Sequence, residues 1–321
     1  MSKLGWIKKE NNNGKSFYTQ CEQKTIYVAH TSTSQVAEAI NSEETSCYQG
    51  QGLTSYRVSQ QGIKLPKGAY VHYPESCMAN TPERLVSMEL RSDKYIRIPS
   101  LSDPLEKDIK EFIDSEDYFK SIETLFKRGY LFYGPPGTGK TTLVRETVKH
   151  LIPKNSVVIT CTGIPSDSFL ENIRVTLSDV FKILIFEELA SCLNEENTES
   201  FLNFTDGEKS LDKCLILATT NYPERLPISI VSRPSRFDNL IYVGDPNKDE
   251  RALLLTHYLK RTPTQDEINS TDKMSAAAIK EICFIVHKSR SSVAEASAIL
   301  KKHKELVKRD FNQNGKKIGF E

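Results

Sequence analysis

Short runs of apolar residues recur through the middle of the chain, separated by amphipathic stretches of helical length. A run of four to seven such residues indicates a strand that is buried on both faces of a sheet. In the stretches between the runs, apolar residues return every three or four positions, as in a helix with one buried face. The predicted strands are 129–133, 156–161, 182–186, 215–219 and 240–243. Their alternation with helices predicts an α/β fold built on a parallel sheet.

The pattern outside this region defines two further parts of the chain. Helices are predicted over 104–126, 141–151 and 169–181 around the strands, and over 249–261, 276–287 and 292–308 after them. We therefore expect a large sheet domain over residues 96–246 and a helical lid over 247–321. Before them, strands are predicted at 25–29, 69–73 and 95–99 and a short helix at 35–40, between polar connections. Residues 1–95 are thus expected to form a separate, strand-rich N-terminal domain.

The strongest motif directly follows the strand 129–133. Residues 134–142 fit the pattern G-x-x-x-x-G-K-[ST] between a strand and a helix. Glycines let successive backbone N–H groups turn toward a polyanion, and the helix adds its positive end. We expect Lys140 to bridge the β- and γ-phosphates of ATP and the Thr141 hydroxyl to bind Mg²⁺. The predicted nucleotide-binding residues are Gly134, Pro135, Pro136, Gly137, Thr138, Gly139, Lys140, Thr141 and Thr142.

Polar residues follow two later strands of the predicted sheet. Glu187 and Glu188 come directly after the strand 182–186, and Asn221 lies just beyond the strand 215–219. We expect Glu187 to act on the metal ion or its waters, and Glu188 to accept a proton from the attacking water. The Asn221 amide is expected to contact the γ-phosphate or to orient that water. Without the glycine-rich loop upstream, solvated polar residues at strand ends would explain the same pattern.

Two arginines lie three positions apart in the segment Ser-Arg-Pro-Ser-Arg-Phe-Asp at 232–238. Guanidinium groups stabilise the charge on a transferring phosphoryl group, and a neighbouring subunit often supplies them. Arg233 and Arg236 are therefore candidate catalytic residues, and in that case the chain is active only as a ring or filament. Two surface arginines in ion pairs remain the alternative for this segment taken alone.

Composition narrows the class of partner. The chain has 43 Lys and Arg against 42 Asp and Glu, so no bulk attraction to nucleic acid is expected. The basic cluster at 301–309 is explained by a solvated helix face. No run approaches the length of a membrane span, and the N-terminus lacks the apolar core of a signal peptide. Seven cysteines without a C-x-x-C pair indicate reduced thiols and a cytoplasmic location.

In their order and spacing, these segments resemble the AAA family of ATPases from about residue 95 to 300. Residues 134–142 are similar to its Walker A motif, 183–188 to Walker B and Thr220–Asn221 to sensor one, while Arg233 and Arg236 resemble its paired arginine fingers. The resemblance implies that ATP and Mg²⁺ bind between the large domain and the lid. It also implies a homo-oligomeric ring, with a hexamer as the default, whose arginines act on the next subunit.

Within the family, residues 127–133 and 201–207 and the glutamate at 187 are similar to the branch containing the mitochondrial respiratory complex III assembly chaperone. That chaperone carries an N-terminal membrane helix, which we do not expect here. The loop 162–168 lacks the aromatic–apolar–Gly pore motif of threading members, so processive threading is not expected. Arg290 is either a sensor-two arginine that reaches the γ-phosphate or a charge at a helix start.

The resulting hypothesis is ATP hydrolysis in a ring that remodels or disassembles a protein partner chosen by the N-terminal domain. Two alternatives stay open. A regulatory ATPase subunit would switch a partner effector through its nucleotide state, with little turnover. A nucleic-acid motor or loader would need a basic pore or groove, for which only the cluster at 301–309 is a candidate.

Overall fold

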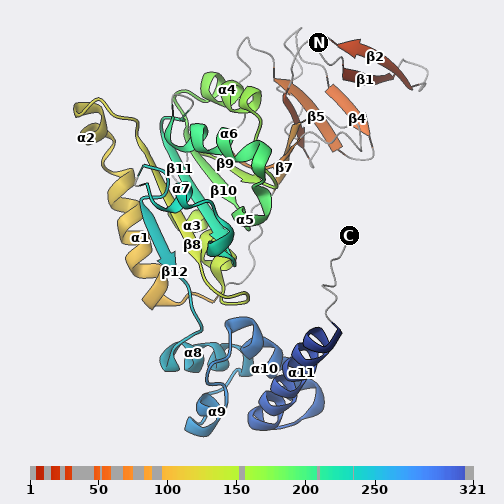
Figure 1. Cartoon of the computed structure of the whole chain (residues 1–321), viewed down its shortest axis with the longest axis vertical. Helices are drawn as coiled ribbons and strands as arrows, with labels where there is room; N and C mark the ends of the chain where they lie inside the picture. The colour runs from red at the N-terminus through yellow and green to blue at the C-terminus, as the bar shows by residue number, and fades with distance from the viewer. Residues whose placement is uncertain are drawn as a thin grey trace. The chain divides into compact units, whose positions relative to one another are not determined.

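The computed structural model describes residues 5–10, 16–21, 26–30, 47–50, 53–58, 68–74, 83–88, 96–151, 156–207, 210–233 and 235–314 of the chain (Figure 1). They belong to two compact units. The first comprises Met1–Asp93, Glu106–Phe132 and Thr147–Ile241, and the second Lys94–Leu105, Tyr133–Glu146 and Tyr242–Glu321. The expected division into three domains stays a prediction.

The first unit contains a sheet with the strand order β12-β8-β11-β10-β9-β6-β7-β3-β5-β4. Its central strands are β8 (Lys127–Tyr133), β9 (Ser156–Cys161), β10 (Phe181–Phe186), β11 (Cys214–Thr220) and β12 (Asn239–Tyr242). The strands β9, β10 and β11 are parallel neighbours, and Phe186 lies level with Cys161 on one side and Ala218 on the other. These strands confirm the predicted α/β sheet.

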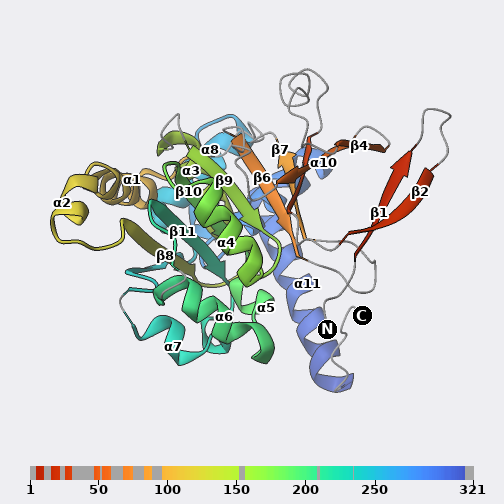
Figure 2. The ribbon, with the colours of Figure 1, turned by 90° about the horizontal axis from the view of Figure 1, so that it is seen from above.

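Helices cover both faces of this sheet, which explains why its strands read as continuous apolar runs. The helices α4 (Asp167–Thr176) and α6 (Glu195–Asp206) lie on one face (Figure 2). Their phenylalanines are buried in one core with residues of the strands. The ring of Phe186 meets that of Phe201 edge-on, with centroids 5.4 Å apart. On the other face, Ile109 of α1 and Val148 of α3 line a small apolar cavity together with residues of β10 and β11.

The N-terminal segment is rich in strands, as expected. They are β1 (Gly5–Glu10), β2 (Ser16–Cys21), β3 (Ile26–His30), β4 (Cys47–Gly50), β5 (Leu53–Val58), β6 (Gly68–Tyr73) and β7 (Arg84–Met88). The predicted strands 25–29 and 69–73 correspond to β3 and β6, whereas the helix predicted at 35–40 lies outside the described residues. Strand β6 pairs in parallel with β9, so this segment continues the large sheet at the β9 edge.

Several predicted boundaries were wrong because a side chain or a proline ends or begins a helix. The predicted strand 95–99 is not formed by its described residues, since α1 (Pro99–Ile113) begins at Pro99, a residue suited to the first helical turn. The predicted helix 104–126 is two helices, α1 and α2 (Glu116–Ser121). Between them, the Ser115 hydroxyl donates to the Phe112 carbonyl oxygen at 2.6 Å, which competes with helix continuation.

The predicted helix 169–181 also ends early. Helix α4 stops at Thr176, and the buried Lys182 donates to the carbonyl oxygens of Leu177 (2.7 Å) and Val180 (2.9 Å) just beyond it. After residue 95, α6 and four shorter elements were not predicted. The shorter ones are α5 (Leu189–Cys192), the 3₁₀ turn η2 (Pro223–Arg225), α7 (Ile228–Val231) and α9 (Gln265–Ser270). In the N-terminal segment, the strands β1, β2, β4, β5 and β7 were not predicted either.

The second unit includes α3 (Lys140–Leu151) in part and the C-terminal helices. The predicted lid helices are confirmed as α8 (Lys248–Leu259), α10 (Ala276–Ser289) and α11 (Val293–Asn314). They share an apolar core in which Leu255, Ile279 and Val293 are fully buried. None of the helices in the described part of the chain is long and apolar enough to cross a lipid bilayer.

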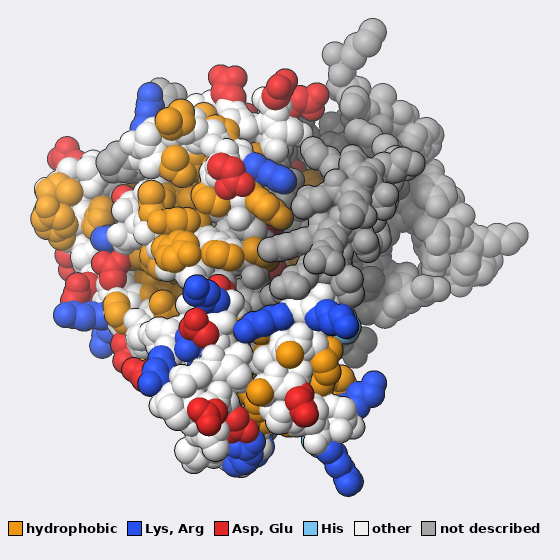
Figure 3. All heavy atoms as spheres, turned by 60° about the horizontal axis from the view of Figure 1, so that its bottom comes forward, with side chains coloured by type: hydrophobic (Ala, Val, Ile, Leu, Met, Phe, Trp, Pro, Cys, Tyr) orange, Lys and Arg blue, Asp and Glu red, His pale blue; other side chains and the backbone are white. Residues whose placement is uncertain are grey.

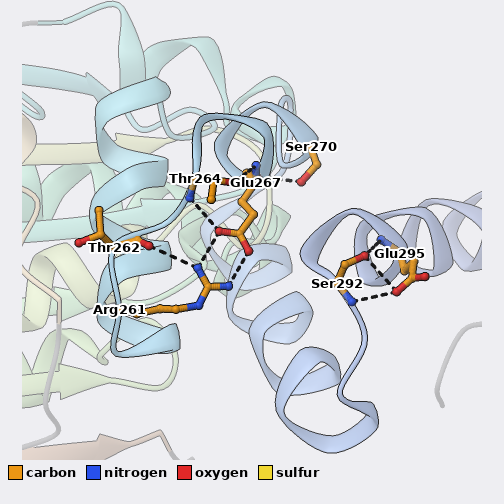
Figure 4. A network of polar contacts seen from close by, with 7 residues as sticks. All are labelled: Arg261, Thr262, Thr264, Glu267, Ser270, Ser292 and Glu295. Atoms are coloured by element: carbon orange, nitrogen blue, oxygen red, sulfur yellow. Dashed lines mark hydrogen bonds and ion pairs between the residues drawn. The ribbon is translucent and has the colours of Figure 1, made fainter.

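A carboxylate at the start of α9 fixes the connection from α8. The guanidinium of Arg261 donates to both oxygens of Glu267, at 2.8 and 2.5 Å (Figure 4). Glu267 also accepts from the Thr264 backbone N–H, which completes a capping box. The Arg261 hydrogen bonds are the main cause that lowers the pKa of Glu267 from 4.5 to about 2.

Candidate active site

The glycine-rich loop joins β8 to α3 in a backbone conformation that requires glycine. Gly134, Gly137 and Gly139 have φ angles of 143°, 79° and 102°. A Cβ on Gly134 would lie 2.3 Å from the carbonyl oxygen of Val243, so a side chain there would clash with backbone. A Cβ on Gly139 would meet no atom within 4 Å, so the loop borders open space at this position. An open, glycine-lined turn at a helix N-terminus fits a bound phosphate.

Lys140 carries the positive charge of this loop. Its side chain is buried, and its ammonium donates to the carbonyl oxygens of Gly134 (2.8 Å) and Pro135 (2.7 Å). The Thr138 hydroxyl donates to the same Pro135 oxygen at 3.0 Å. These contacts hold the ammonium over the loop at the start of α3, where the helix dipole is also positive. Thr141 follows in the first turn of α3, so its hydroxyl is near the same end of the helix.

Two small residues at the start of α10 contact the loop, and the sequence analysis did not identify them. The Ala277 N–H donates to the Gly137 carbonyl oxygen at 2.9 Å. A Cβ on Gly137 would lie 3.1 Å from the Ala277 Cβ and 3.2 Å from the Ser275 Oγ. The sequence feature that could have identified them is the run of alanines that directly follows the N-cap residue Ser275. Arg290 lies at the opposite end of α10, exposed and with a φ of 54°, and its role stays a prediction.

Glu188 and Asn221, predicted separately, are in direct contact at the end of β10 and β11. One carboxylate oxygen of Glu188 accepts from the Asn221 backbone N–H at 2.8 Å, and the other accepts from the Asn221 side-chain amide. The Thr220 hydroxyl lies 3.4 Å from the first oxygen. The Glu188 backbone N–H donates to the Thr219 hydroxyl at 3.1 Å. The structure therefore brings the predicted base and the predicted water-orienting amide together.

Glu187 precedes this contact and is half-buried. Among the residues that the structure describes, no group of three His, Cys, Asp or Glu side chains forms a ready metal site. The predicted ligands are one hydroxyl and one carboxylate. Such a pair fits Mg²⁺ in nucleotide sites, where one or two protein oxygens act together with phosphates and water. Thr141 and Glu187 remain its predicted ligands.

The two candidate arginines differ in burial and in the distance to their common ion-pair partner. Arg236 is buried, its Nε lies 3.3 Å from Asp206 Oδ2, and its Nη1 donates to the Ser229 carbonyl oxygen. The side chain of Arg233 is 66% exposed, and its Nη1 is 3.9 Å from the same Asp206 oxygen. The Ser235 hydroxyl, 2.6 Å from Asp206 Oδ1, is the main cause that lowers the pKa of Asp206, followed by Arg236. The sequence analysis did not identify Asp206 as the partner of these arginines. The only sequence feature that marks it is its position before Gly207, at the end of a helix.

Comparison with known proteins agrees with this geometry. Residues 130–245 match the family model of the ATPase family associated with various cellular activities (AAA). The human ATPase family gene 2 protein homolog A is 31% identical over 244 residues, which cover 66% of this chain and 26% of that protein. The probable mitochondrial chaperone bcs1 of Schizosaccharomyces pombe is 28% identical over 196 residues, covering 57% of this chain and 43% of that protein. The human mitochondrial chaperone BCS1 is 29% identical over 159 residues, which cover 45% of this chain and 38% of that protein.

The matched segment spans less than half the length of each of these relatives. It contains the glycine-rich loop, the acidic strand end, Asn221 and both arginines in one continuous stretch. The chain therefore carries an AAA ATPase domain over residues 130–245, and it is similar to the mitochondrial BCS1 chaperones.

Proposed function

We propose that this chain hydrolyses ATP in the presence of Mg²⁺ and uses the energy to remodel a protein partner. The observation that carries the proposal is the loop before α3, in which three glycines have positive φ angles and the buried Lys140 donates to the carbonyl oxygens of Gly134 and Pro135. Its residues would bind the phosphates, and Thr141 and Glu187 would hold Mg²⁺. The metal ion, when bound, neutralises charge that develops on the phosphates.

Glu188 is proposed to accept the proton of the attacking water. Its carboxylate is oriented by Asn221 through the backbone N–H at 2.8 Å and through the side-chain amide. A carboxylate held in one orientation can take up a proton without first reorganising. We take Glu188 and the glycine-rich loop to act on one nucleotide because the family's motifs occur here in the same order.

We further propose that the chain assembles into a ring, by default a hexamer, in which Arg233 reaches the nucleotide of the neighbouring subunit. Arg233 is the exposed member of the pair, so its guanidinium is accessible to another chain. Arg236 would first have to leave its ion pair with Asp206. An arginine that enters from outside stabilises transition-state charge and makes turnover depend on assembly.

The N-terminal segment is proposed to select the partner. The loop after β9 contacts this segment: Thr162 donates from its hydroxyl to the His72 carbonyl oxygen at 2.8 Å, and the Ser166 N–H donates to Glu83 at 2.9 Å. The N-terminal strands are thus attached where threading relatives have a pore loop. On the face shown in Figure 3, basic and acidic side chains are intermixed, which favours a protein partner over nucleic acid.

Affinity capture tests the remodelling proposal. Glu188→Gln is expected to bind ATP and retain its partner, whereas Lys140→Ala is expected to bind neither. A specific protein recovered only with Glu188→Gln in ATP would support the proposal. Recovery of nucleic acid that is lost at higher salt would contradict it, because phosphate contacts weaken as salt rises.

A further inference from the structure

Glu188 has an unusual backbone conformation that something in the structure must maintain. Its φ and ψ angles are 53° and 55°, in the left-handed region. Residues with a Cβ rarely occupy this region, and they stay there only where neighbouring groups hold them. The conformation decides the direction in which the Glu188 side chain leaves the end of β10. A residue that fixes this backbone would therefore also fix the position of the proposed base.

Thr219 contacts the N–H side of that backbone, while the Glu188 carbonyl oxygen accepts from the Ser191 N–H at 2.8 Å within α5. The Glu188 N–H donates to the Thr219 Oγ1 at 3.1 Å. Thr219 is 2% exposed, so bulk water has little access to replace its hydroxyl. It belongs to β11, whose pairing with β10 sets Ala218 level with Phe186. The register between β10 and β11 therefore places the Thr219 hydroxyl next to Glu188.

The next residues of β11 and its end contact the other part of Glu188. Asn221 donates twice to the carboxylate, and the Thr220 hydroxyl lies 3.4 Å from it. Three consecutive residues therefore hold Glu188 at two points, its backbone and its carboxylate. If the hydrogen bond to Thr219 were lost, the Glu188 N–H would be released, and only the carboxylate contacts and the Ser191 N–H on the Glu188 carbonyl oxygen would resist rotation of the strained residue.

We propose that Thr219 is a positioning residue for ATP hydrolysis, whose hydroxyl fixes the left-handed backbone of Glu188. The inference rests on the proposed role of Glu188 as the base. Thr219 would act only through Glu188 and would not contact the nucleotide. Valine has nearly the same shape but cannot accept a hydrogen bond, so Thr219→Val would leave the Glu188 N–H without this partner. The backbone would then turn toward another acceptor and carry the carboxylate with it.

The test compares Thr219→Val and Thr219→Ser in steady-state ATP turnover with Mg²⁺. Thr219→Val is expected to lower kcat roughly ten- to a hundredfold, because small misplacements of a catalytic group have effects of this size. Its KM is expected to change by less than about threefold, since ATP binding is untouched. Thr219→Ser keeps the hydroxyl, so this variant is expected to retain most of the wild-type kcat. Thr271→Val removes another buried hydroxyl, which donates to the Ile268 carbonyl oxygen at 2.8 Å, and is the control that keeps normal turnover.

A double variant separates positioning from a general loss of structure. If Thr219 acts through Glu188, adding Thr219→Val to Glu188→Gln should cause no further loss of turnover. If the valine variant does not fold, Thr219→Cys supplies a weaker acceptor of similar size, and an intermediate kcat is expected. Normal kcat in the folded valine or cysteine variant would overturn the inference, as would equal losses in the valine and serine variants. Normal turnover in Glu188→Gln would instead overturn the proposed role of the base.

Discussion

The carboxylate of Asp206 holds Arg236 by its Nε at 3.3 Å, while Arg233 lies at 3.9 Å from the same oxygen and remains largely exposed. The two arginines of one motif therefore differ in what their removal should do. Arg233→Ala should abolish most turnover with little change in the free energy of unfolding. Arg236→Ala should also destabilise the fold, by about 2 kcal/mol, because it removes the nearer ion-pair partner of Asp206 and leaves the Ser229 carbonyl oxygen without the Arg236 donor.

Thermal unfolding and ATP turnover of both variants check this difference. Mixing supplies a second test, since Lys140→Ala subunits still carry intact arginines. Arg233→Ala mixed with Lys140→Ala should regain part of the activity if the arginine acts on a neighbouring subunit. Equal losses of stability in the two arginine variants would contradict the assignment, and the absence of any rescue would contradict the shared site.

Gly129 is expected to be required for the position of the arginine segment. A Cβ at Gly129 would lie 2.2 Å from the Arg236 carbonyl oxygen, and its N–H donates to Asp238 at 2.8 Å. Gly129→Ala should therefore displace this segment, destabilise the fold by about 2 kcal/mol and lower turnover. Gly68→Ala is the matched control, because a Cβ there would be in ordinary van der Waals contact with the Tyr70 side chain, at 3.9 Å from its Cε2 and its hydroxyl oxygen. Unfolding midpoints in urea compare the two, and equal effects would refute the expected clash.

The Arg261–Glu267 pair predicts how stability depends on pH. The pKa of Glu267 is lowered to about 2 in the folded chain, mainly by the Arg261 hydrogen bonds, from an ordinary 4.5. Its ionised form is thus favoured by folding, so the stabilisation is present above about pH 4.5 and is lost as the pH falls toward 2. Wild type should exceed Glu267→Gln in unfolding midpoint at pH 7, and the difference should shrink on acidification. The exposed Glu281→Gln serves as the control, and a difference that grows in acid would contradict this reading.

The central strands could be predicted closely because burial on both faces leaves an unbroken apolar run. The predicted strand 156–161 coincides with β9, and the predicted start of helix 276–287 coincides with that of α10. Errors arose where one local contact decides the boundary. Pro99 starts a helix instead of ending a strand, and the Ser115 hydroxyl divides a stretch whose apolar spacing favours one helix.

For the candidate site, too, contiguous features could be predicted from the sequence and contacts between distant segments could not. The phosphate-binding loop is contiguous in sequence, so its residue types and order identify it directly. The contact of Glu188 with Thr219 and Asn221 depends on the register between two strands, which a single sequence does not reveal. The burial of Arg236 depends on Asp206, the last residue of a helix that the sequence analysis did not predict.

The most direct test of the account is ATP turnover with Mg²⁺ by the purified chain, measured beside Glu188→Gln and Lys140→Ala, with nucleotide binding determined for all three. We expect the wild type to hydrolyse ATP, Glu188→Gln to bind ATP with turnover lowered by about a hundredfold or more, and Lys140→Ala to lose binding. Hydrolysis by Glu188→Gln at the wild-type rate, or undiminished ATP binding by Lys140→Ala, would contradict the central claim.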